Sequence, residues 1–175
     1  MKTTNHNWQQ PFRELYEKAL ARYSSGHREP QTMFTPEETE VLRSLGAKPM
    51  ELYDYAEDSD DVDWETALLI AAVRRDYFLQ EQNGIWSEHL MKSDALPPKP
   101  EPLEGIPWLP RLIEKAKGRL RGELPDEVMY CCGGDRNFFQ THDIHPADFL
   151  RLVWAVKGEP DKIVAYVKKQ QPVAG

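Results

Sequence analysis

Apolar residues recur at intervals of three and four along most of the chain, which is the periodicity of one face of an α-helix. The first such face comprises Trp8, Phe12, Leu15, Tyr16, Ala19, Leu20 and Tyr23. Similar patterns predict helices in residues 36–45, 49–56, 64–82, 107–121, 146–154 and 160–167. The longest of these, 64–82, is apolar on nearly all sides around Leu68–Val73, and we expect it to be the central helix.

Helix-start signals agree with this periodicity. Thr35-Pro36-Glu37-Glu38 is a capping box with proline at the first helical position, and Asp63 is a good N-cap for the long helix. Pro49 and Pro146 suit the first position of two further helices. Only Val128-Met129-Tyr130 resembles a strand. The sequence therefore predicts an all-α fold of about eight short-to-medium helices.

A proline-rich segment interrupts the helical pattern. Residues 92–107 contain Pro97, Pro98, Pro100, Pro102 and Pro107, and such a run favours extended polyproline conformation over helix. We expect it to connect an N-terminal helical lobe (1–91) to a C-terminal helical lobe (108–175), the two packing on a shared core as one compact unit.

Composition and charge narrow the classes of function. Hydrophobic residues make up 40% of the chain, and its 5 Trp, 7 Tyr and 6 Phe residues supply enough large side chains for a core. The formal net charge of −7 disfavours general nucleic-acid binding, which needs a basic surface. Residues 105–175 carry 11 Lys and Arg against 9 Asp and Glu, so this part is better suited than the acidic remainder to accept a small anion.

The sequence favours a cytoplasmic protein that does not cross a membrane. The first seven residues contain no apolar signal-peptide core, and the longest apolar run, Ala67–Val73, is too short to span a bilayer. Two adjacent cysteines do not form a secreted disulfide framework, because such a bridge must join distant parts of a chain. No motif calls for a cofactor, and nothing indicates the oligomeric state.

Four short motifs follow one another in the C-terminal part of the chain. They are Trp108-Leu109-Pro110-Arg111-Leu112-Ile113, Gly122-Glu123-Leu124, Gly134-Asp135-Arg136 and Pro146-Ala147-Asp148-Phe149-Leu150. With this order and spacing, residues 103–169 resemble a bacterial family described as domain of unknown function 5069. The resemblance implies a folded helical unit and brings no activity or catalytic residue with it.

The candidate binding site is the Gly133-Gly134-Asp135-Arg136 turn. Two residues without side chains let a ligand approach the backbone, and Asp135 can cap a short helix that begins at Arg136. The Arg136 guanidinium suits a carboxylate or phosphate. Arg111 and Lys115 belong to a basic stripe with Arg119 at every fourth position of the 107–121 helix; such stripes are usually solvated.

We expect Arg111 and Lys115 to complete a pocket with the Cys131–Arg136 stretch. Its partner would be a small anionic ligand or another protein. An alternative left open by the residues alone is that the turn has only a structural role.

A second hypothesis is a thiol- or metal-dependent enzyme. A cysteine placed before a helix N-terminus and an arginine can have a lowered pKa, so Cys131 or Cys132 could act as nucleophile with His142 or His145 as base. The same four residues could ligate a metal, but adjacent cysteines lack the spacing that lets two thiolates converge on zinc, and we expect no metal site. A third class, a purely structural interaction protein, also remains open.

Overall fold

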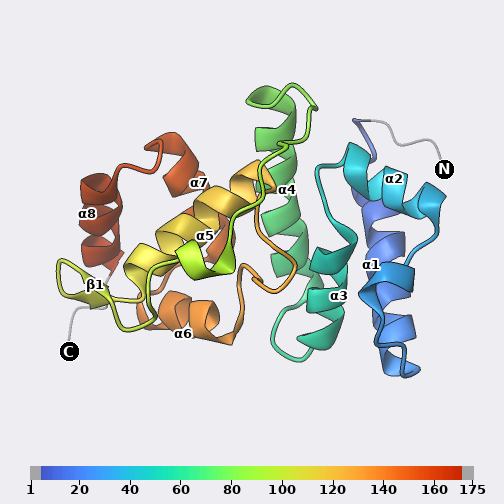
Figure 1. Cartoon of the computed structure of the whole chain (residues 1–175), viewed down its shortest axis with the longest axis horizontal. Helices are drawn as coiled ribbons and strands as arrows, with labels where there is room; N and C mark the ends of the chain where they lie inside the picture. Colours follow the sequence, from blue (N-terminus) through green and yellow to red (C-terminus); the bar gives the residue numbers. More distant parts are fainter. Residues whose placement is uncertain (1–4, 171–175) are drawn as a thin grey trace. The chain divides into compact units, whose positions relative to one another are not determined.

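The computed structural model of the protein describes residues 5–170, and this part of the chain is predominantly α-helical (Figure 1). The α-helices are α1 (Gln9–Ser24), α2 (Pro36–Ser44), α3 (Pro49–Glu57), α4 (Trp64–Gln80), α5 (Leu109–Arg121), α6 (Gly133–Thr141), α7 (Pro146–Ala155) and α8 (Pro160–Gln170). Two 3₁₀ turns, η1 (Pro30–Thr32) and η2 (Ser93–Ala95), and two short strands complete the regular structure of these residues. The all-α prediction is confirmed.

The chain divides into two compact units, with the boundary between Trp86 and Ser87. The first unit has 9 Lys and Arg residues against 16 Asp and Glu, whereas the second has 13 of each. The whole formal charge of −7 is therefore carried by the first unit. The boundary lies a few residues before the one expected between the N-terminal lobe and the proline-rich segment.

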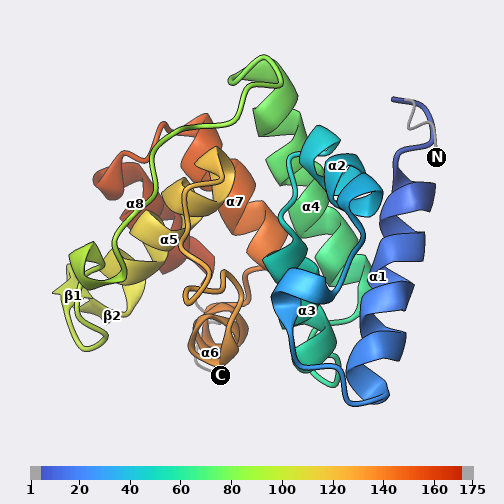
Figure 2. The ribbon, with the colours of Figure 1, turned by 45° about the vertical axis from the view of Figure 1, so that its right-hand side comes forward.

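In the first unit, side-chain caps fix where the helices begin. The Thr35 hydroxyl accepts from the Glu38 N–H at 3.3 Å, and the Glu38 carboxylate accepts from the Thr35 N–H at 2.9 Å, so the predicted capping box forms. The Asp63 carboxylate accepts from the Thr66 N–H at 2.8 Å at the start of α4. Helices α1 and α3 lie side by side, as Figures 1 and 2 both show.

Two arginines on α4 are buried among aromatic rings. Arg74 is 0% exposed, and its guanidinium lies 5.1 Å from the ring centres of Phe78 and Trp86. Arg75 is 8% exposed and lies 5.1 Å from the Trp8 ring. These cation–π contacts, together with hydrogen bonds from Arg74 to Gln82 and from Arg75 to Asn5, accommodate two consecutive buried charges on α4.

In the second unit, the proline-rich segment packs as part of the fold. The Arg111 guanidinium donates to the Pro97 carbonyl at 3.0 Å, and Leu96 is buried. Strands β1 (Pro102–Leu103) and β2 (Ile106–Pro107) pair antiparallel, and β1 contacts α5. The strand-like 128–130 run is not a strand, and the hairpin was not predicted, because its turn at Glu104 and Gly105 lies among prolines that mask the pattern.

Helices α5 and α7 pack against each other in the second unit. Trp108, with a φ of 70°, precedes α5, and Gly122, with a φ of 71°, ends it. The apolar face of α5 is buried as predicted, but two members of its basic stripe, Lys115 and Arg119, are also buried, so the expectation of a solvated stripe is wrong for them. Within residues 5–170, no helix combines the length and apolar character that crossing a membrane requires.

Glycine substitutions at two equivalent helix ends should separate backbone strain from packing. Gly46 after α2 and Gly26 after α1 both adopt positive φ, 73° and 96°, and both helix ends have the paired hydrogen bonds of a Schellman motif. A Cβ on Gly46 would lie 2.9 Å from Phe78, whereas a Cβ on Gly26 meets nothing within 4 Å. Gly26→Ala should cost about 1 kcal/mol of unfolding free energy, and Gly46→Ala about 2 kcal/mol more, as measured by urea unfolding. Equal losses would contradict the packing account.

Candidate functional site

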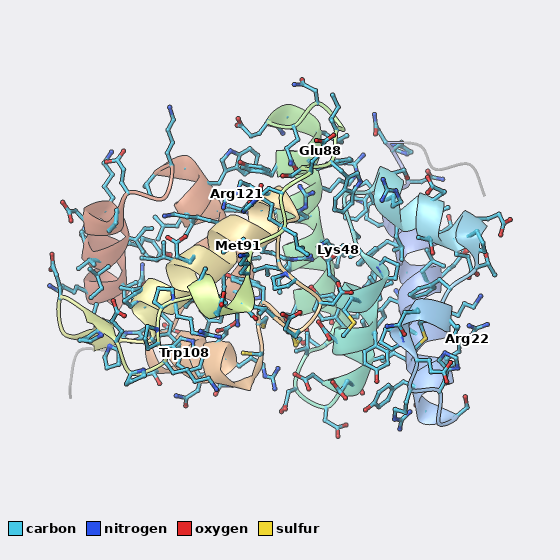
Figure 3. All side chains as sticks on the ribbon, viewed as in Figure 1. Arg22, Lys48, Glu88, Met91, Trp108 and Arg121 are labelled. Atoms are coloured by element: carbon cyan, nitrogen blue, oxygen red, sulfur yellow. The ribbon has the colours of Figure 1, made fainter. Side chains whose placement is uncertain are left out.

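A buried carboxylate lies at the centre of the candidate site. Asp135, on α6, is 0% exposed. Its Oδ1 accepts from the Trp108 indole N–H at 2.9 Å, and its Oδ2 accepts from the Lys115 ammonium at 2.5 Å and from the Cys131 N–H at 2.9 Å. Trp108 stands at the start of α5, where it is labelled in Figure 3. Asp135 thus joins three parts of the second unit: the start of α5, the middle of α5 and the loop before α6.

The same carboxylate holds two residues in an unfavourable backbone conformation. Trp108 and Cys131 have φ values of 70° and 73°, in the left-handed region that side chains disfavour. Each such residue costs on the order of 1–2 kcal/mol. Strain of this kind persists only where the surroundings enforce it, and here Asp135 bonds the side chain of one residue and the backbone of the other.

The two glycines of the turn have different roles. A Cβ on Gly134 would lie 2.3 Å from the Trp108 ring, so a side chain there would displace the indole. Gly133 is exposed, and a Cβ there would meet only the Arg136 guanidinium, 3.7 Å from Nη2. Gly134 is therefore required for packing, whereas Gly133 has open space where a side chain would lie.

Helix α6 begins earlier than the sequence indicated. We expected Asp135 to cap a helix starting at Arg136, but the helix starts at Gly133 with Cys132 as the N-cap. Asp135 lies inside the first turn and faces the interior because a buried lysine attracts it. The thiol of Cys132 makes no capping hydrogen bond.

The start of α6 has unused backbone donors. The first N–H groups of any helix lack an intrahelical acceptor. Within residues 5–170, neither the Gly133 N–H nor the Gly134 N–H has a hydrogen-bond acceptor. The Arg136 guanidinium, which donates to the Cys131 carbonyl at 2.9 Å, lies beside Gly133. Helix dipole, backbone donors and arginine thus present positive charge at one exposed point.

The two basic residues expected to complete the pocket lie elsewhere or are already paired. Lys115 does reach the Cys131–Arg136 stretch, but it is 2% exposed and its charge is matched by Asp135. Arg111 donates to the Pro97 carbonyl at 3.0 Å, in the proline-rich segment. Arg119 is buried, and burial lowers its pKa to about 10, which still leaves it charged at neutral pH. Of the four basic side chains, Arg136 is the one next to the exposed backbone donors.

The two adjacent thiols differ sharply in their surroundings. Cys131 is buried, and burial, with the nearby Asp135 carboxylate, raises its pKa to about 12. The expectation of a lowered pKa at Cys131 is therefore wrong, because this thiol stays protonated at neutral pH. Cys132 is half-buried, and its Sγ accepts from the Lys115 ammonium at 3.3 Å. Neither cysteine forms a disulfide.

The two histidines of the enzyme hypothesis contact residues other than the cysteines. His145 is the N-cap of α7, where its Nδ1 accepts from the Ala147 N–H at 3.1 Å. The His142 ring contacts the Phe138 ring, with centroids 4.4 Å apart and the ring planes tilted by 41°, and burial lowers the pKa of His142. In the described part of the chain, no three His, Cys, Asp or Glu side chains come together as a metal-ligand set.

Trp108 is the site residue that the sequence did not single out. It was noted only as part of a family motif, and nothing in its spacing shows that its indole reaches a carboxylate 27 residues later. Comparisons of the chain with models of protein families, with curated proteins and with solved structures found no match. Membership of the family described as domain of unknown function 5069 stays a prediction.

The Lys115–Asp135 pair can be tested by removing one charge at a time. Lys115→Met leaves a buried carboxylate without its cation, and Asp135→Asn leaves a buried ammonium without its anion. Each should lower the free energy of unfolding by about 3–5 kcal/mol, and the double variant should lose much less than the sum. Urea unfolding followed by tryptophan fluorescence measures all three.

Lys162→Met provides the control for this cycle. Lys162 pairs with Glu159 on the surface, with more than half of each side chain exposed, so its loss should cost under about 1 kcal/mol. Additive losses for Lys115 and Asp135 would show that the two charges do not depend on each other.

Proposed function

We propose that the second unit is a ligand-binding module that takes a small anion at the start of α6. The observation that carries the proposal is the pair of unused backbone donors at Gly133 and Gly134, next to the Arg136 guanidinium. A phosphate or carboxylate oxygen accepts from several donors at once, and it is attracted by the positive end of a helix dipole. The even charge balance of this unit does not oppose an anion, in contrast to the acidic first unit.

We propose anion binding and not catalysis by the cysteines. Among residues 5–170, no hydrogen bond joins either cysteine to His142 or His145, and the better buried thiol, Cys131, has a raised pKa. The support is therefore for binding through backbone and guanidinium donors, with Asp135 and Lys115 as positioning residues. A cytoplasmic setting belongs to the same proposal, and what supports it is that Cys131 and Cys132 are both free thiols.

Gly133→Pro removes one proposed donor with little change to the fold. Proline is favoured at the first position of a helix, where its missing N–H has no helical acceptor. Cys132 has φ −65° and ψ 172°, the extended conformation that a residue before proline prefers, and no atom besides the Arg136 guanidinium lies near an added Cβ. The variant should fold normally and bind inorganic phosphate about tenfold more weakly or worse, since hydrogen bonds to charged groups are worth about 1.5–3 kcal/mol.

Isothermal titration calorimetry at constant ionic strength measures the affinity, with inorganic phosphate and acetate as probes. Arg136→Ala should weaken binding as well, whereas Arg151→Ala removes an exposed arginine of α7 in the same unit and should leave it unchanged. Equal affinities for wild type, Gly133→Pro and Arg136→Ala, or an equal loss with Arg151→Ala, would contradict the proposal.

A further inference from the structure

The first unit contains a partly enclosed cavity between α1 and α2. Its volume is about 260 Å³. Pro11 and Leu15 from α1 and Val41 from α2 give it an apolar lining. Pro11 and Leu15 are buried, so this lining is part of the packed structure and is already formed without a ligand.

Carboxylates also line this cavity. Glu14, Glu37 and Glu38 line the cavity together with a single cation, Lys18. The Lys18 ammonium donates to both oxygens of Glu38, at 2.5 and 2.7 Å, so these two charges offset each other. The other two carboxylates leave the cavity with a net charge of −2.

Those two carboxylates have no cation of their own. The Glu14 carboxylate accepts from the Gln10 amide at 3.2 Å, which is a neutral donor. Glu37 stands in the first turn of α2, where hydrogen bonds from its own N–H and from Thr35 lower its pKa and keep it ionised. Within residues 5–170, neither Glu14 nor Glu37 has a Lys or Arg partner.

An apolar lining with two unmatched carboxylates complements a cation on an aliphatic stem. The stem of a lysine side chain has four methylene groups that can contact Pro11, Leu15 and Val41 while its ammonium remains near the carboxylates. The surrounding unit has an excess of seven acidic over basic residues, which attracts a basic partner from a distance. A small anion, the ligand proposed for the second unit, would be repelled here.

We propose that this cavity is a docking site for a lysine side chain presented by a basic segment of a partner protein. Glu14 and Glu37 would bind the ammonium, and the Pro11, Leu15 and Val41 side chains would contact its stem. The site is independent of the anion site, because it lies in the other unit and has the opposite charge preference.

The test uses the full chain and a fluorescein-labelled peptide of six residues with lysine in alternation with glycine. Fluorescence anisotropy should show saturable binding that weakens as salt is added, because the attraction is between exposed charges. The double variant Glu14→Gln/Glu37→Gln should bind at least about tenfold more weakly, a loss equivalent to about 1.4 kcal/mol. Circular dichroism checks that the variant is folded.

Glu17→Gln/Glu65→Gln is a matched control. Glu17 accepts from the residue four positions before it on α1, as Glu14 does, and Glu65 lies in the first turn of a helix, as Glu37 does. Neither control residue lines the cavity, and this variant removes the same amount of negative charge. It should bind the peptide within about twofold of wild type, since a tenfold change corresponds to about 1.4 kcal/mol and twofold to less than about 0.5 kcal/mol. An equal loss in both double variants would show general attraction to an acidic surface and overturn the proposal.

Acetylating the peptide's lysines removes their charge and keeps their stems. The acetylated peptide should not bind detectably, and n-butylammonium should displace the unmodified peptide, since it has the same stem and head group. Undiminished binding of the acetylated peptide, or no effect of n-butylammonium, would contradict recognition of a lysine side chain.

Discussion

The second unit depends on one buried interaction, the contact between the Asp135 carboxylate and the Lys115 ammonium. Both side chains are almost completely buried, so each charge is compensated by the other and not by water. The carboxylate also accepts from Trp108 and Cys131, and both of these residues have the disfavoured positive φ. One side chain therefore orients α5 against α6 and stabilises the strained backbone at both ends of the site.

The buried Lys115–Asp135 pair determines which hydrogen-bond donors are exposed at the start of α6. With Asp135 directed inward, no carboxylate caps α6, and the Gly133 and Gly134 N–H groups lack acceptors in the described residues. A serine, threonine, aspartate or asparagine N-cap at position 132 could have accepted from the Gly134 or Asp135 N–H; the thiol found there contacts Lys115 instead. The exposed positive site at Arg136 and Gly133 thus results from the pairing of Asp135 with Lys115 in the interior.

The sequence predicted the parts of the fold that depend on local signals. The capping box at Thr35, the proline at the first position of α3 and the N-cap at Asp63 act within a few residues, so the helix starts could be inferred. The Lys115–Asp135 contact joins residues 20 positions apart, and periodicity alone indicated a solvated basic stripe. For the same reason the helix start at Gly133 was missed: Asp135 has the features of an N-cap, and only the buried lysine shows that it points inward. Of the residues expected to form one pocket, the Arg136 guanidinium lies beside Gly133, whereas Arg111 donates to the Pro97 carbonyl.

The central claim is that the backbone at the start of α6 binds an anion. A titration of the ¹⁵N-labelled full chain with inorganic phosphate, followed by amide chemical shifts at constant ionic strength, tests it directly. The account predicts that the Gly133 and Gly134 amide signals shift saturably and together, while the exposed Gly26 and Gly105 signals do not move. Unchanged Gly133 and Gly134 signals, or shifts of the same size at Gly26 and Gly105, would contradict it.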